Sequence, residues 1–219
     1  MSSLFKPWAN TVFRVTLVGL ATFLIGGIAF AMVYVRSPLF TGQNDPIQQP
    51  LQFDHRHHVG DEGIDCRYCH NTVEKSPSAG IPPTSLCLNC HSQIWNKSPL
   101  LEPVRQAFFN DRAIPWKRVH HLPGFVYFNH SIHLAKGVGC ETCHGRVDRM
   151  AAVAKKESLS MGWCLDCHRN PGPHLRPRDQ LTTMGWKPPD TAGERDALAQ
   201  KLLHDHDVQT RTSCSTCHC

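Results

Sequence analysis

Ten of the eleven cysteines occur in pairs separated by two residues, and a histidine directly follows each pair. The five C-x-x-C-H motifs are Cys66, Cys69 and His70; Cys87, Cys90 and His91; Cys140, Cys143 and His144; Cys164, Cys167 and His168; and Cys214, Cys217 and His218. Two thiols at this spacing can each form a thioether with one vinyl group of a haem, and the adjacent histidine reaches the iron as its proximal ligand. The motifs therefore predict five covalently attached haem c groups.

Zinc sites and disulfides are the competing interpretations of paired cysteines. A structural zinc site takes four ligands, usually from two C-x-x-C pairs, and five pairs do not divide evenly among such sites. Neither zinc nor a disulfide framework requires a histidine after every pair. Histidine makes up 15 of 219 residues, so the chance of one after all five pairs is on the order of one in a million. The pattern favours haem, and the unpaired Cys219 receives no role.

Each iron also needs a second axial ligand unless that position stays open. The sequence F-[DN]-H-x-x-H begins at Phe53 and begins again at Phe128. Histidines three residues apart lie on neighbouring parts of one helical turn, so one element can approach two haems. We therefore predict that four distal ligands come from these two segments, namely His55, His58, His130 and His133. His57 is left out because the second segment has Ile132 at the equivalent position.

The fifth distal ligand has several candidates. His120 is preferred because it lies close in sequence to His130 and His133. The other candidates are His121, His174, His204, His206, Met161 and Met184. A methionine ligand would raise the reduction potential of its haem above that of bis-histidine neighbours.

The distal-ligand segment and the haem motifs repeat together along the chain. Phe53 to Phe128 is an offset of 75 residues, and Cys66 to Cys140 is an offset of 74. The second motif of each repeat is nearly the same, CLNCH and CLDCH. Such self-similarity predicts two related dihaem modules, at residues 53–127 and 128–175. A C-terminal extension at residues 176–219 then carries the fifth motif.

An apolar segment precedes the haem motifs. Residues 15–35 form a run of 21 residues without a charge, which is long enough to cross a membrane as a helix. A cleaved signal peptide is the alternative, because Ala29-Phe30-Ala31 resembles a cleavage site, but the run exceeds the usual hydrophobic region of a signal. We therefore expect an uncleaved cytoplasmic tail and anchor at residues 1–36, followed by a linker at residues 37–52.

The expected orientation follows from the haem chemistry and the flanking charges. Haem c is attached outside the cytoplasm, so the haem domain is expected on the periplasmic or extracellular side of the cytoplasmic membrane. Lys6 and Arg14 precede the apolar run, which agrees with a cytoplasmic N-terminus. The net charge of +5 is spread in short groups without a long basic run, so the sequence does not indicate a nucleic-acid partner.

The expected fold is mainly irregular with short α-helices, plus the one transmembrane helix. Haem groups replace much of the side-chain core that long elements would bury. The 16 prolines and 15 glycines agree with this expectation. Outside the haem motifs we predict helices at residues 98–113 and 190–204, the second with Asp190 as its N-cap. Residues 171–189 are expected to be extended.

The F-[DN]-H-x-x-H…C-x-x-C-H unit resembles the small class III multihaem cytochromes c. That resemblance implies that the first histidine of the pair ligates the haem that follows and the second reaches another haem. Five motifs behind one anchor, together with VHHLPGFVYFNHSIH and GWCLDCHRNPGPHLRP, resemble more closely the pentahaem membrane-anchored cytochrome c subunit of alternative complex III, a quinol-oxidising respiratory complex. A single histidine commonly follows Arg-Val in that family, which favours His120 over His121.

The resemblance implies an electron-transfer subunit that is not itself an enzyme. Its implied partners are an iron–sulfur protein related to molybdopterin oxidoreductases, polytopic quinol-binding subunits and a monohaem cytochrome c or terminal oxidase. A membrane-anchored quinol dehydrogenase cytochrome that feeds a periplasmic reductase is the alternative, and it would need a haem close to the membrane surface. A catalytic multihaem reductase is a third possibility, which needs an open iron position. The spatial order of the haems, the final acceptor and the quinone type stay open.

Overall fold

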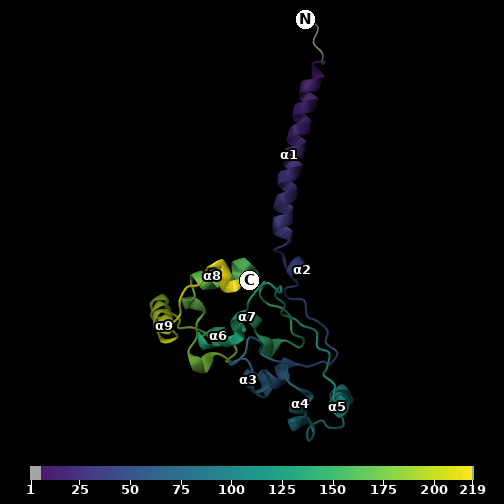
Figure 1. The fold of residues 1–219 in the computed structure, drawn as a ribbon, viewed down its shortest axis with the longest axis vertical. Helices are drawn as coiled ribbons and strands as arrows, with labels where there is room; N and C mark the ends of the chain where they lie inside the picture. Colours follow the sequence, from purple (N-terminus) through teal and green to yellow (C-terminus); the bar gives the residue numbers. More distant parts are fainter. Residues whose placement is uncertain (1–5, 219) are drawn as a thin grey trace. The chain divides into compact units, whose positions relative to one another are not determined.

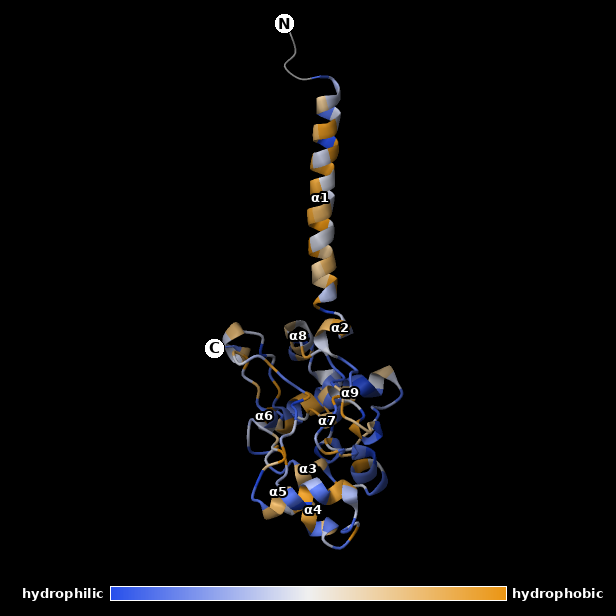
Figure 2. Cartoon of the chain, turned by 90° about the vertical axis from the view of Figure 1, so that its right-hand side faces the viewer, coloured by the Kyte–Doolittle hydropathy of each residue, from blue (hydrophilic) through white to orange (hydrophobic). Residues whose placement is uncertain are grey.

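The computed structural model describes residues 6–218, which form two compact units, one up to Gln43 and one from Asn44 on. The first unit consists of α1 (Trp8–Tyr34) and the short α2 (Pro38–Thr41). Apolar side chains cover α1 along most of its length (Figure 2), and none of its residues is buried. By length and composition α1 is able to cross a membrane. It starts before the predicted span, so Arg14 lies within the helix, where its long side chain can reach toward the water interface.

The second unit consists of short helices joined by irregular chain (Figure 1). Its elements are the π-helix η1 (Arg56–Asp61), α3 (Cys66–Cys69), α4 (Thr84–His91), η2 (Pro99–Leu101), α5 (Glu102–Phe109), α6 (His130–Ala135), α7 (Cys140–His144), η3 (Val147–Arg149), α8 (Met161–Arg169), η4 (Gly172–His174), η5 (Arg178–Gln180), α9 (Ala192–Asp205) and α10 (Cys214–Cys217). Within residues 44–218, β-pairing is limited to isolated bridges such as Val138 with Leu175. The predicted irregular, short-helix fold is confirmed, while its duplication into two modules stays a prediction.

Few apolar side chains are buried in the second unit. One cluster contains Val73, Leu134 and Leu181, and the half-buried Cys140 of a haem motif packs against it. A domain of this size normally buries a much larger side-chain core. The small core agrees with the expectation that haem groups fill much of the interior.

Polar N-caps set the start of several helices that carry site residues. The Asp65 side chain accepts a hydrogen bond from the backbone N–H of Arg67 at the start of α3, and Asn129 caps α6 in the same way. Ser160 accepts from the backbone N–H of Trp163 at the start of α8. These caps satisfy backbone donors that have no partner within the helix. The first turn of each helix, which positions a cysteine or a histidine, is therefore fixed by local sequence.

Both helices predicted outside the haem motifs are present. In α5, Pro103 lies in the first turn and Val104 is only 1% exposed, whereas Phe108 remains exposed. The predicted cap of α9 was wrong, because Thr191 and not Asp190 is the N-cap. The Thr191 hydroxyl accepts from the backbone N–H of Glu194 and donates to the Glu194 carboxylate at 2.6 Å. The Thr191 hydroxyl thus satisfies two polar groups of Glu194, its backbone N–H and its carboxylate, which Asp190 does not.

The segment at residues 171–189 is not extended throughout, as had been expected. It contains the two 3-10 turns η4 and η5. Proline is tolerated in the first turn of a helix because its missing N–H would have no partner there. The prolines that suggested an extended chain therefore start turns here instead.

Replacing Thr191 by Ala should loosen the first turn of α9 because the Thr191 cap is lost. We expect a loss of about 1 kcal/mol, which makes amide hydrogen exchange in residues 192–198 roughly five times faster. Asp190→Ala is the matched control and should leave this exchange unchanged. Faster exchange in the Asp190 variant alone would show that the cap had been assigned to the wrong residue.

Candidate haem sites

Each C-x-x-C-H motif forms one short helical turn, and we number the motifs as sites 1 to 5 along the chain. Their helices are α3, α4, α7, α8 and α10. Residues three positions apart lie on the same side of a helix, so the two thiols of each motif face the same way. This is the arrangement that two thioether bonds to one porphyrin edge require. All five motifs can therefore hold a haem c by their cysteines.

The ring Nδ1 atoms of six site histidines lie within hydrogen-bond distance of backbone carbonyl oxygens. The pairs are His70 with Gly80 (2.7 Å), His91 with Ile94 (3.2 Å), His168 with Arg211 (2.9 Å), His58 with Asp54 (3.0 Å), His130 with Pro77 (2.7 Å) and His133 with Asn129 (2.7 Å). A carbonyl oxygen only accepts, so Nδ1 must carry the proton and donate it. In the neutral ring Nε2 is then unprotonated and free to bind a metal. Three proximal and three predicted distal histidines therefore each have an Nε2 atom that is free to bind an iron.

Three predicted distal histidines face a proximal histidine at a common distance. The ring centroids are 6.2 Å apart for His58 and His91, 6.3 Å for His130 and His144, and 6.1 Å for His133 and His168. A metal ion with two imidazoles on opposite sides and bonds of about 2 Å holds the ring centroids roughly 6 Å apart. The spacing therefore fits axial ligand pairs at sites 2, 3 and 4.

The phenylalanine that begins each F-[DN]-H-x-x-H segment packs on both histidines that follow. Phe53 lies 4.8 Å from His55 and 4.3 Å from His58, with ring planes 85° and 28° apart. Phe128 lies 4.7 Å from both His130 and His133, with ring planes 87° and 28° apart. The two segments thus hold their histidines in nearly the same way, although the first is a π-helix and the second an α-helix. Each phenylalanine restricts both rings to one orientation.

His55 and His144 are kept neutral by their surroundings. Desolvation lowers the pKa of His55 to about 4, and the neighbouring His70 adds to the shift. Desolvation also lowers the pKa of His144 to about 3, with further contributions from His120 and His130. The neutral imidazole is the form that binds a metal, so these rings are ready as ligands throughout the physiological range. The assignment of His55 as the distal ligand of site 1 stays a prediction.

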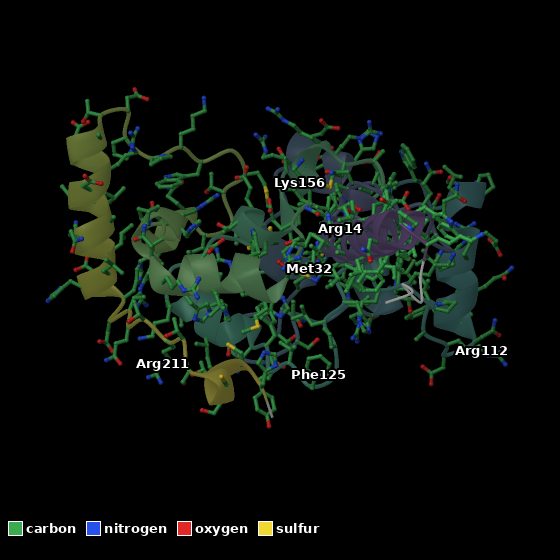
Figure 3. All side chains as sticks on the ribbon, turned by 90° about the horizontal axis from the view of Figure 1, so that it is seen from above. Arg14, Met32, Arg112, Phe125, Lys156 and Arg211 are labelled. Carbon is green, nitrogen blue, oxygen red and sulfur yellow. The ribbon has the colours of Figure 1, made fainter. Side chains whose placement is uncertain are left out.

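His120 lies at site 3 in this structure. Its ring centroid is 4.3 Å from that of His144, with the planes 73° apart, and its buried Nε2 has no hydrogen-bond partner. At this spacing the two rings contact each other directly, leaving no room for a metal between them. The His218 ring of site 5 instead lies 5.8 Å from Phe125 (Figure 3). The role of His120 as the fifth distal ligand therefore stays a prediction.

The other candidate ligands are placed in different surroundings. His206 is buried, with Nε2 at 3.2 Å from the Arg176 carbonyl, so that nitrogen is occupied. His57 is exposed and pairs with Asp61 at 2.8 Å, which agrees with its exclusion from the predicted ligands. The remaining candidates are exposed or half-buried side chains outside these contacts, namely His121, His174, His204, Met161 and Met184. Cys219 lies outside the described residues.

Sequence reasoning missed a largely buried ion pair at site 3, in which the Arg176 side chain is 9% exposed and the Glu141 side chain 19%. Glu141, inside the third motif, accepts hydrogen bonds from the Arg176 guanidinium at 3.3 Å and from the backbone N–H of Gly185 at 2.8 Å. A Cβ atom on Gly139 would lie 2.6 Å from the Arg176 side chain, so only glycine leaves room for this arginine. The variable position within C-x-x-C-H gives no hint of the pair, because Arg176 is 35 residues away.

Among residues 6–218, no cluster of three or more His, Cys, Asp or Glu side chains converges as the ligands of a bare metal ion would. The cysteines instead lie in pairs on separate helical turns, and at sites 1, 2 and 4 the histidine beside the pair has a free Nε2. The donor set thus fits haem c, in which the porphyrin supplies the remaining ligands.

Comparison with known proteins identifies the family. No protein-family model matches the chain. Over 144 residues the chain is 33% identical to the menaquinone reductase, multiheme cytochrome c subunit, of Nitratidesulfovibrio vulgaris (strain Hildenborough), an alignment that covers 56% of this chain and 69% of that protein. The chain belongs to this family of multihaem cytochromes c. Covalently bound haem c follows from this membership, while the number of five haems and the individual iron ligands stay predictions.

Replacing Arg176 by Met should destabilise this cytochrome, because Glu141 loses its buried cation. We expect a loss of about 2–3 kcal/mol in the free energy of unfolding of the haem-loaded protein, measured by denaturant titration. The control is Arg169→Met, which removes an exposed pair with Asp166 at 3.9 Å and should cost less than about 1 kcal/mol. Equal losses in the two variants would contradict a structural role for the Arg176–Glu141 pair.

Proposed function

We propose that this cytochrome is a non-catalytic electron-transfer subunit that carries five haem c groups between a membrane quinone pool and a redox partner. Haem c supplies reversible one-electron transfer when it is bound. The observation that carries the proposal is the set of three histidine pairs with ring centroids 6.1–6.3 Å apart, which would close both axial positions. A closed iron has no place for a substrate, which favours electron transfer over catalysis.

The chain contributes position and ligation to this function. The proposed thioether residues are the ten cysteines of sites 1 to 5, and the proposed proximal ligands are the histidines that follow them. His55, His58, His130 and His133 are the proposed distal ligands of sites 1 to 4 in that order. Carbonyl hydrogen bonds at His58, His130 and His133 hold these rings with Nε2 available. Rigid ligation of this kind limits structural change on oxidation and reduction, which suits rapid transfer.

We further propose that the second unit arose by duplication. The matching ring geometry of Phe53 and Phe128 supports equivalent dihaem modules at residues 53–127 and 128–175. The carbonyl hydrogen bonds of His58 and His133, each to the residue four positions earlier, support the same equivalence. The extension at residues 176–219 would have been added with the fifth site.

The proposed location is the cytoplasmic membrane, with α1 as a single uncleaved anchor, the N-terminus inside and the haem domain outside. The sequence resemblance favours an alternative complex III, in which electrons from quinol oxidation pass through iron–sulfur clusters of a partner to this subunit. A monohaem cytochrome c or terminal oxidase would then accept them. The quinol site belongs to polytopic partner subunits in this proposal.

A menaquinone-reducing assembly is the second candidate, and the named relative favours it. That protein is a subunit of a menaquinone reductase. A chain of low-spin haems can conduct in either direction, because the potentials of its donor and acceptor decide the net flow. The two candidates therefore differ in the partner proteins and not in the geometry of the sites.

Purification of the complex from detergent-solubilised membranes tests the proposed function. We expect iron–sulfur and polytopic quinone-binding subunits to co-purify, and the intact mass of this chain to include α1 and five haems. Quinol-driven reduction of its haems, followed by transfer to added cytochrome c, would support alternative complex III. Haem-dependent menaquinone reduction with no quinol oxidation would support the second candidate. Purification as a lone subunit that itself binds carbon monoxide when reduced would contradict electron transfer between partners.

Replacing His58 by Ala should open the distal position at site 2. We expect one of five haems to change from low-spin to high-spin, seen in the visible spectrum and by electron paramagnetic resonance. His57→Ala is the matched control, because His57 points to solvent beside Asp61 and should leave all five haems low-spin. An unchanged spectrum in the His58 variant would refute its assignment as a ligand.

A further inference from the structure

Sites 1 and 2 are neighbours through residues inside their own motifs. The Asn89 side chain of site 2 donates a hydrogen bond to the Tyr68 hydroxyl of site 1 at 3.4 Å. The two motifs therefore meet at this hydrogen bond between α3 and α4.

Sites 1 and 3 are joined by a short segment that is distant from both in sequence. We call residues Leu181–Thr183 the strap. The backbone N–H of Cys140 donates to the Leu181 carbonyl at 2.9 Å, and the Thr182 hydroxyl donates to the Asp65 cap of α3 at 2.8 Å. The Cys66 thiol lies 4.0 Å from the Thr182 carbonyl. One strap thus holds the first cysteine of site 1 beside the first cysteine of site 3.

A second contact supports the same junction. His130, at the start of α6, donates from Nδ1 to the Pro77 carbonyl in the loop that follows site 1. Val73 from that loop packs with Leu134 of α6 and Leu181 of the strap. The two halves of the second unit therefore meet where sites 1 and 3 lie.

Sites 3 and 4 are joined by α6, which reaches both. His130 faces His144 of site 3, and His133, one turn later, faces His168 of site 4. In the η1 segment, His58 likewise faces His91 of site 2.

Sites 4 and 5 are joined by the chain that leads into α10. His168 of site 4 donates from Nδ1 to the Arg211 carbonyl at 2.9 Å, three residues before Cys214 of site 5 (Figure 3). Site 5 therefore lies beside site 4.

From these contacts we infer that the five sites form a linear path in the order 2–1–3–4–5, which differs from their order in the sequence. The helices α4, α3, α7 and α8 follow one another in this order across the second unit (Figure 1). Sites 2 and 5 are then the ends at which partners exchange electrons, and electrons pass from one half of the second unit to the other at the contact between sites 1 and 3. The inference rests on the proposed function in that each motif must carry a haem.

Each step along this path moves one electron between neighbouring sites and forms or breaks no bond. The order predicts that site 1 is internal, with two neighbours, and that site 2 is terminal, with one. In a path that followed the sequence, site 1 would be terminal and site 2 internal. A comparison of sites 1 and 2 therefore separates the two orders.

Methionine substitutions of the distal ligands provide this comparison in the fully loaded protein. His55→Met and His58→Met should each raise the reduction potential of one haem, so that it takes up the first electron. Haem-methyl resonances of the partly reduced protein then report which other haems lie next to it. We expect two other haems to respond in the His55 variant and one in the His58 variant. His57→Met is the control and should raise no potential.

The outcomes separate the order of the sites from the ligand assignment. One responding haem in the His55 variant and two in the His58 variant would overturn the order 2–1–3–4–5. A response of all four other haems in both variants would overturn a linear path of any order. If neither variant raises a reduction potential, the proposed assignment of His55 and His58 as distal ligands is wrong. The order of the sites is then decided by removal of single haems.

Removal of single haems does not depend on the distal ligands. Cys66→Ala with Cys69→Ala removes the haem of site 1, and Cys87→Ala with Cys90→Ala removes that of site 2. After pulsed photoreduction, we expect electron equilibration among the remaining haems to be at least tenfold slower in the site 1 variant only. Mass spectrometry must show four haems in each. Slow equilibration in the site 2 variant alone would overturn the proposed order.

Discussion

The hydrogen bond from a histidine Nδ1 to a backbone carbonyl is the interaction on which the sites depend. It fixes the neutral tautomer and points Nε2 away from the backbone, toward the position that an iron would take. Six site histidines have this bond, and the carbonyls belong to loops that lie as far away in sequence as Pro77 from His130. The irregular segments between the helices thus supply hydrogen-bond acceptors at defined positions, in addition to connecting the helices.

The small side-chain core explains why the stability of the second unit depends strongly on such polar contacts. With few buried apolar residues, the second unit depends on N-caps, the strap and the largely buried Arg176–Glu141 pair to hold its short helices together. Haem attachment would add the apolar surface that the polypeptide lacks. Folding and haem binding should therefore be closely coupled, as in other proteins whose interior is completed by a cofactor.

Membership of a multihaem cytochrome c family agrees with the histidine pairs that face each other at sites 2, 3 and 4. The protein need only place its haems at fixed positions and close their axial coordination, since the redox chemistry belongs to the haem. The repeated packing of Phe53 and Phe128 on two histidines each shows how one short segment can serve two neighbouring sites. Each repetition of that segment would add ligands for two more sites of an electron path.

The sequence by itself determined the haem motifs, the paired histidines, the apolar helix and the family resemblance, because each depends on spacing within a few residues or along one repeat. It also predicted α5 and α9, although it assigned the cap of α9 to Asp190 instead of Thr191. Only the tertiary structure decided which distal histidine faces which site and that His120 contacts His144. It also revealed the strap between sites 1 and 3. These contacts join residues tens of positions apart, and no local pattern specifies which irregular segments will meet.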